Sequence, residues 1–137
     1  MKKERFVHLV LAILGVSAVI LNAMPNCVLM RFASDPWLVG PGLSYYEYCS
    51  GFSLLPVGYA IWGAMLAGIG AASLTILSCV GMIWDGTVLR KWQTAIAIIS
   101  LLMILSLLLV GSMTLISGII AVILASAAVF SLLNLNK

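Results

Sequence analysis

Four apolar runs that contain no Asp, Glu, Lys or Arg constrain this chain more than any other feature. They cover residues 6–24, 57–84, 92–110 and 115–134. Each run has or approaches the roughly 20 residues that a helix needs to cross about 30 Å of hydrocarbon. Inside lipid, backbone amides and carbonyls find no water and must bond within their own segment as helices. The sequence therefore predicts an all-α fold, an integral membrane four-helix bundle.

Composition identifies lipid as the solvent of most of the chain. Hydrophobic residues make up 64% of the sequence and charged residues only 8%, whereas a soluble domain is about a quarter charged. A length of 137 residues leaves room for a single transmembrane domain, residues 1–137. The net charge of +3 is small and the basic residues are scattered, which argues against a nucleic-acid partner. The lipid bilayer is the partner that this composition requires.

The spacing of the runs sets the loops between them. Residues 92–134 are too long for one crossing, so we expect a tight helical hairpin at 111–114, where Gly-Ser-Met-Thr interrupts the apolar sequence. Residues 25–56 form the one larger loop, between the first and second helices. Its Gly and Pro residues break regular structure. A short helix or hairpin around residues 43–49 is an alternative for that part of the loop.

Basic residues give the orientation. Six of the seven lie in segments that four crossings place on one side, and the seventh, Arg31, lies in the large loop. The six are Lys2, Lys3, Arg5, Arg90, Lys91 and Lys137. By the positive-inside rule, both termini and the loop after residue 84 are cytoplasmic, and the large loop is extracytoplasmic. We expect the location to be the plasma membrane of a bacterium.

A cleaved signal peptide is the alternative for the first run, because a basic start precedes it. The run is long, however, and Leu21-Asn22-Ala23 is a poor match to the small-x-small pattern of a cleavage site. We therefore expect an uncleaved first helix.

Two cysteines of the large loop can form a disulfide. Cys27 and Cys49 would lie on the oxidising side and would close a loop of 23 residues. Such a constraint stabilises by about 3 kcal/mol in the chain-entropy account. Two free thiols are the alternative. Cys79 falls in the inner half of the second run, where we expect it to be a small packing residue.

Small residues predict which helices touch, because close backbone approach drives helix association inside lipid. The second run has one row at Ala60, Ala64, Gly68 and Ala72 and another at Gly63, Ala67 and Ala71, and the fourth run has Ser117, Ala121 and Ala125. Two small faces predict that the second helix lies at the centre, against the first and fourth, with the leucine-rich third helix facing lipid. These rows are explained by intramolecular packing or, alternatively, by an oligomer interface or a lipid-binding cleft.

The sequence contains no constellation of catalytic or metal-binding residues. His8 is the only histidine and falls at interface depth, where we expect a wetted side chain rather than a proton carrier. One His and three Cys on two sides of a membrane cannot share a zinc ion. The first run lacks the carboxylate of a small multidrug exporter, and the chain lacks the Cys-x-x-Cys pair of a thiol oxidoreductase. We therefore predict a protein that is not an enzyme and has no cofactor.

The residues that lead into the second run carry a resemblance. An aromatic stretch from Tyr45 to Tyr48 precedes a Phe-x-Leu-x-Pro-x-Gly-Tyr-Ala pattern. The anchors of that pattern are Phe52, Leu54, Pro56, Gly58, Tyr59 and Ala60. Residues 45–60 thereby resemble the start of the second helix in small uncharacterised four-helix membrane proteins of Gram-positive bacteria. The resemblance implies topology and a bacterial source, and it implies no activity.

The four-helix plan with a Trp and two Cys in the first outer loop also resembles that of claudins. Here Cys27 precedes Trp37, and Pro36-Trp37-Leu38 is not followed by the second Trp of the claudin pattern. We therefore disfavour that family.

These features favour a non-enzymatic membrane protein with an interaction role, either an accessory subunit or a self-assembling bundle. Its partner would be a second copy of the chain or a larger membrane protein. The alternative is a small oligomeric channel or carrier for an uncharged or hydrophobic solute, which would use the small-residue rows and hydroxyl groups.

Overall fold

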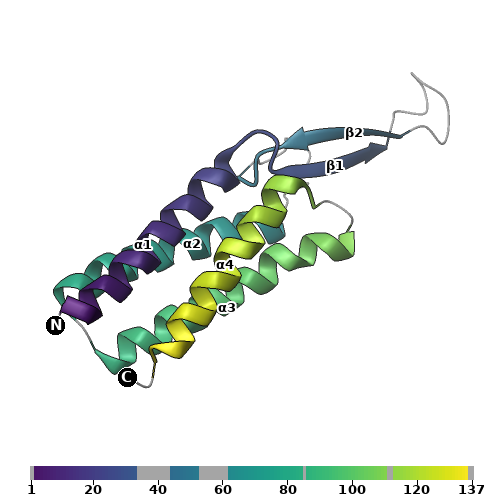
Figure 1. The fold of residues 1–137 in the computed structure, drawn as a ribbon. Coiled ribbons are helices and arrows are strands. Elements are labelled where there is room, and N and C mark those ends of the chain that lie inside the picture. The colour runs from purple at the N-terminus through teal and green to yellow at the C-terminus, as the bar shows by residue number, and fades with distance from the viewer. Residues whose placement is uncertain (1, 34–43, 53–61, 85, 111–112, 136–137) are drawn as a thin grey trace.

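The described residues form four long helices and one β-hairpin. The computed structural model describes residues 2–33, 44–52, 62–84, 86–110 and 113–135. The helices are α1 (Lys2–Ala23), α2 (Trp62–Ile83), α3 (Thr87–Val110) and α4 (Leu115–Leu133), and the strands are β1 (Val28–Ala33) and β2 (Ser44–Cys49). The helices lie side by side, with both chain termini at one end of the bundle and the hairpin at the other (Figure 1).

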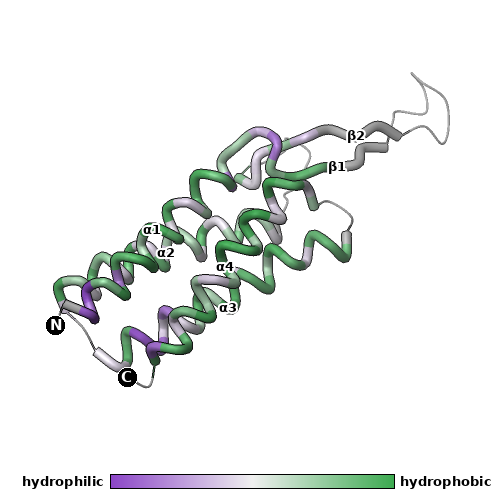
Figure 2. Tube along the Cα trace, in the orientation of Figure 1, coloured by the Kyte–Doolittle hydropathy of each residue, from purple (hydrophilic) through white to green (hydrophobic). Residues whose placement is uncertain are grey.

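All four helices are long and apolar enough to cross a membrane, by length and composition. Figure 2 shows hydrophobic residues along most of each helix and the strongly hydrophilic ones gathered towards the two ends of the bundle. The prediction of four helices that are long and apolar enough to span a membrane is therefore confirmed. The first turn of α3 begins at Thr87 rather than at residue 92, because Arg90 and Lys91 can continue a helix beyond the hydrocarbon.

The predicted break between the third and fourth helices has a defined local cause. Thr114 is the N-cap of α4, and its hydroxyl accepts a hydrogen bond from the backbone amide of Ser117. The Ser117 hydroxyl accepts in return from the amide of Thr114, which completes a capping box. Two backbone donors at the start of the helix are thus satisfied within the turn. Residues 111–112 of the predicted break lie outside the described residues.

The helices form a closed ring of four neighbours without a central member. The close pairs are α1 with α2, α2 with α3, α3 with α4, and α4 with α1. Between 33% and 39% of an 18-residue stretch of each helix is buried inside the protein, so the four helices are enclosed to a similar extent. The predicted central position of α2 and its predicted contact with α4 are therefore wrong, whereas its predicted contact with α1 is confirmed. α3 exposes Leu102, Leu108 and Leu109, as predicted, but it is not more exposed than α1 or α2. Ser100 and Ile104 of α3 are fully buried in the core.

The small residues of α2 serve two interfaces at once. Ala64, Ala67 and Ala71 are buried. A Cβ atom at Gly63 would lie against Ser106 of α3, and one at Gly70 would lie against Ser100 of the same helix. Small rows on α2 therefore allow close contact with α3 as well as with α1, and for this reason the prediction of α4 as a neighbour was wrong.

The remaining predicted packing residues occupy different environments. On α4, Ser117 and Ala121 are buried, whereas Ala125 is partly exposed. Ala72 of α2 is also partly exposed, and Gly68 is buried. Ala60 lies outside the described residues.

The large loop contains an antiparallel hairpin instead of irregular structure alone. β1 and β2 pair in a register that runs from Val28 opposite Cys49 to Ala33 opposite Ser44. The strands contain Val, Phe and three Tyr residues, the aromatic and β-branched types that favour extended backbone. The hairpin projects beyond the helix ends (Figure 1).

Candidate functional site

Asn22, near the end of α1, joins three segments at the hairpin end of the bundle. Its side chain is 1% exposed. The Nδ2 atom donates to the carbonyl of Ala64 on α2 at 3.0 Å, and Oδ1 accepts from the Cys27 thiol at 3.4 Å. Its backbone carbonyl accepts from the amide of Gly51 at 2.8 Å and from the Ser50 hydroxyl at 3.2 Å. One residue therefore ties both bases of the hairpin to α1 and α2.

Two glycines allow this close approach to Asn22. A Cβ atom at Gly51 would overlap the Asn22 amide group, and a Cβ atom at Gly68 would overlap both the Asn22 amide and the Phe52 ring. Any larger side chain at either position must displace Asn22 from its hydrogen bonds.

Thr114 forms the second attachment of the hairpin, from the start of α4. Its hydroxyl lies 2.6 Å from the carbonyl of Cys27 and 3.1 Å from that of Asn26, so its single proton is shared between them. Val28 also forms an isolated antiparallel bridge with Met113. The base of the hairpin is thus bonded to the turn before α4 as well as to α1 and α2.

No disulfide joins Cys27 and Cys49, so the structure does not support the predicted bridge. Cys49 lies opposite Val28 in the hairpin register, which leaves Cys27 one position out of line with it. The Cys27 thiol is directed instead to Asn22. Burial raises the pKa of Cys27 from its ordinary value of 9.0 to about 11, and a backbone hydrogen bond from Gly51 partly opposes this. Cys79 is exposed on the surface of α2 and so is not the interior packing residue that we expected.

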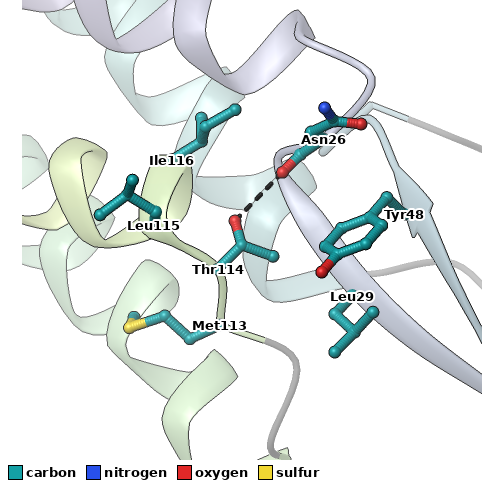
Figure 3. A pocket seen from close by; sticks show the side chains of 7 residues that line it. All are labelled: Asn26, Leu29, Tyr48, Met113, Thr114, Leu115 and Ile116. Atoms are coloured by element: carbon teal, nitrogen blue, oxygen red, sulfur yellow. Dashed lines mark hydrogen bonds between the residues drawn. The ribbon is translucent and has the colours of Figure 1, made fainter.

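A groove of about 500 Å³ opens beside these attachments (Figure 3). Its lining residues are Asn26, Leu29, Tyr48, Met113, Thr114, Leu115 and Ile116. In Figure 3 the side chains of Met113, Leu115 and Ile116 form one wall and those of Leu29 and Tyr48 the other. Leu29 and Tyr48 are directly opposite in the hairpin register and therefore share one face of the hairpin.

A second polar cluster lies at the other end of the bundle, where the chain termini are. The side chain of Gln93 on α3 hydrogen-bonds through Nε2 to His8 Nδ1 on α1 at 3.0 Å and to Ser78 Oγ on α2 at 3.4 Å. The Ser78 hydroxyl itself donates to the carbonyl of Leu74 at 2.7 Å. His8, Gln93 and Ser78 are each at most 1% exposed. The expectation of a wetted His8 is therefore wrong.

Space for the buried imidazole comes from a glycine. A Cβ atom at Gly81 on α2 would lie 2.6 Å from ring atoms of His8. Near the same end, Thr94 of α3 and Ser131 of α4 hydrogen-bond through their hydroxyls at 2.6 Å. Sequence reasoning missed this cluster, although Gln93 is the only glutamine of the chain and stands inside an apolar run.

The charged residues at this end lie nearer the surface. Arg90 of α3 forms an ion pair with Glu4 of α1, with 3.5 Å between Nη2 and Oε1. The Glu4 side chain is 48% exposed, so water and salt screen this pair. The fully buried side chains of the cluster are therefore those of Gln93 and Ser78, which are neutral, and the imidazole of His8.

Neither cluster has the composition of a metal or nucleophile centre. Among the described residues, no group of three or more His, Cys, Asp or Glu is placed to hold a metal ion. The same residues contain no buried side-chain nitrogen or oxygen without a hydrogen-bond partner. Both clusters are suited to holding segments together, since polar side chains that bond across helices stabilise membrane bundles.

Comparison of the chain with protein-family models, with curated proteins and with solved structures gives no match. The resemblance of residues 45–60 to small four-helix membrane proteins therefore stays a prediction. Function must be argued from the two clusters, the hairpin and the groove.

Proposed function

We propose that this protein is a non-enzymatic membrane subunit that presents the β1–β2 hairpin to another protein. The observation that carries the proposal is the double attachment of the hairpin, through Asn22 to α1 and α2 and through Thr114 to α4. An isolated two-stranded hairpin is at best marginally stable in water. Attachment to three helices supplies the support that such a hairpin lacks.

Pre-organisation is the physical advantage of this arrangement. A partner that binds an already ordered segment avoids the entropic cost of ordering it, so more of the contact energy appears as affinity. A two-stranded sheet also offers backbone groups at its edges, to which a partner strand can hydrogen-bond. Tyr48, which is 59% exposed on β2, is of the residue type that is enriched at protein interfaces. The partner is a second copy of the chain or a larger membrane protein.

The proposed orientation places the hairpin outside and both termini in the cytoplasm of a bacterial cell. Six of the seven basic residues fall at the start of α1, at the start of α3 or at the carboxyl terminus. These segments lie at the end of the bundle opposite the hairpin (Figure 1). The charge distribution favours the cytoplasmic side for that end.

Site-specific photocross-linking in native membranes tests this proposal. A photoreactive phenylalanine analogue is placed at Tyr48 and, as a control, at Trp84, which is 77% exposed near the opposite end of the bundle. We expect a discrete protein adduct from position 48 and none of equal yield from position 84. Adducts of equal yield at both positions, or none at position 48, would contradict a hairpin-directed interaction.

An oligomeric channel or carrier for an uncharged or hydrophobic solute is the second candidate. The buried contacts of Gln93 with His8 and Ser78 favour it, because polar groups inside a membrane span often mark a solute path. Solute flux into vesicles that contain the purified protein, compared with a Gln93→Leu variant, separates the two candidates. Flux that the substitution abolishes supports transport, and the absence of protein-dependent flux supports the interaction role.

A further inference from the structure

We infer that the groove between the hairpin and the start of α4 binds one acyl chain of a bilayer phospholipid. The inference concerns the apolar walls that Leu29 and Tyr48 form on one side and Met113, Leu115 and Ile116 on the other. Figure 3 shows these two walls facing each other across Thr114.

The Thr114 hydroxyl at the base of the groove is already hydrogen-bonded. The Thr114 hydroxyl donates to the carbonyls of Cys27 and Asn26. The reciprocal bonds of the capping box engage the amides of Thr114 and Ser117. The Thr114 hydroxyl therefore has no free proton for a polar ligand, whereas an apolar occupant needs none.

The groove continues an apolar surface that already faces lipid. Leu115, at the mouth of the groove, is 82% exposed. Ile119, Val122 and Val129 follow it along α4 and are also exposed. Their spacing of three, four or seven residues places them on one helix face. An acyl chain lying along this face can enter the groove without crossing a polar surface.

The size of the groove favours a chain over a helix. Two turns of an α-helix about 10 Å across occupy roughly 850 Å³, more than the groove volume of about 500 Å³. That volume is within the range of sites for small ligands, roughly 300–1,000 Å³. Tyr48 and the exposed Asn26 at the mouth are suited to the boundary between hydrocarbon and headgroups.

Photolabelling by a lipid tests the inference directly. The full-length protein is reconstituted into phosphatidylcholine vesicles in which a fraction of the lipid carries a diazirine near the headgroup end of one acyl chain. After illumination, peptide mass spectrometry locates the labelled residues. We expect labelling of residues 26–29, 48 and 113–116 in excess of that at Val122 and Val129, which contact lipid outside the groove.

A filling substitution and its matched control sharpen the test. Leu29→Trp should lower groove labelling to the level at Val122 and Val129, because the larger side chain takes up the space of the acyl chain. Val122→Trp, on the same lipid-facing side but away from the groove, should leave groove labelling unchanged. Leu115→Gln repeats the test at an exposed position in case Leu29→Trp prevents folding.

Equal labelling of the groove and the rest of α4 would overturn the inference. So would a groove that stays unlabelled while Tyr48 cross-links to a second copy of the chain, and that result would assign the groove to self-association. Because the photolipid test needs no protein partner, its failure is distinguishable from failure of the proposed interaction role.

Discussion

The two ends of the bundle hold their segments together by different kinds of hydrogen bond. At the end that contains the termini, side chains bond to side chains, as in the contact of Gln93 with His8 and that of Thr94 with Ser131. At the hairpin end, Asn22 and Thr114 bond to backbone carbonyls as well. Side-chain partners can be replaced together by apolar groups, but a backbone carbonyl remains after any substitution. Substitution of the hydrogen-bonding side chains at the hairpin end should therefore lower stability more than substitution at the end that contains the termini.

Asn22→Leu should lower the free energy of unfolding more than any of the other substitutions. The substitution leaves the Ala64 carbonyl and the Cys27 thiol without their partner in a buried site, at a cost of about 3 kcal/mol. We expect a lower free energy of unfolding in a detergent mixture titrated with sodium dodecyl sulfate, and faster amide hydrogen exchange in residues 44–51. Ser17→Ala is the matched control, because the Ser17 hydroxyl bonds only to a carbonyl of its own helix at an exposed position. If both variants unfold alike, Asn22 does not anchor the hairpin.

Gly68→Ala tests the close packing around Asn22. The added methyl group would overlap the Asn22 amide and the Phe52 ring, so we expect a loss of about 2 kcal/mol in the free energy of unfolding. Gly118→Ala on α4 is the control, because no described atom lies within 4 Å of its Cβ position. There the better helix propensity of Ala should stabilise by up to about 1 kcal/mol. Equal effects of the two substitutions would show that α2 does not approach Asn22 closely.

A double-mutant cycle on His8 and Gln93 measures the strength of their hydrogen bond at the opposite end of the bundle. Gln93→Leu alone leaves His8 Nδ1 and Ser78 without this donor, whereas His8→Leu with Gln93→Leu removes both partners of the first bond. We expect a coupling free energy of about 1 kcal/mol, in the range measured for hydrogen bonds between membrane helices. A coupling free energy of zero would mean that the two side chains do not bond in the membrane.

Titration of the Cys27 thiol should have the smallest effect on stability at neutral pH. Its pKa of about 11 in place of 9.0 leaves about a hundredfold fewer thiolates, so alkylation by iodoacetamide should be slow and should accelerate as the pH approaches 11. The raised pKa means that the folded state retains this proton more tightly. Its contribution to stability is therefore full below pH 9 and lost between about pH 9 and 11. A Cys49→Ser, Cys79→Ser background isolates the thiol, and rapid alkylation at pH 7 would contradict its burial.

The membrane helices were predictable because their signal is local. A run without charge must form a helix in lipid whatever lies beside it, and the turn before α4 carries its own N-cap in Thr114. The hairpin was less accessible to prediction, since its register depends on how β1 and β2 pair across residues 34–43, and no local pattern sets that register. Small residues on α2 indicated close packing, but they could not say that the neighbour was α3 rather than α4, because glycine and alanine permit either.

The buried clusters could not be derived from single residues. From sequence alone, His8 is expected to be an interfacial residue. In the structure, Gly81 leaves space for its ring, and Gln93, 85 positions away in the chain, is its hydrogen-bond partner. Likewise, the sequence shows Asn22 only as a residue near the end of a helix. In the structure it is hydrogen-bonded to Ala64, Cys27 and Gly51. Each role arises from residues that only the tertiary structure brings together.

The central claim is a four-span bundle that carries its hairpin on one side of the membrane and its termini on the other. Single cysteines at Tyr48, Gly86 and Leu135, in a background without the native cysteines, test it in intact cells with a membrane-impermeant maleimide. We predict that position 48 is labelled from outside and that positions 86 and 135 are labelled only after permeabilisation. Labelling of positions 86 and 135 from opposite sides of the membrane would contradict the claim.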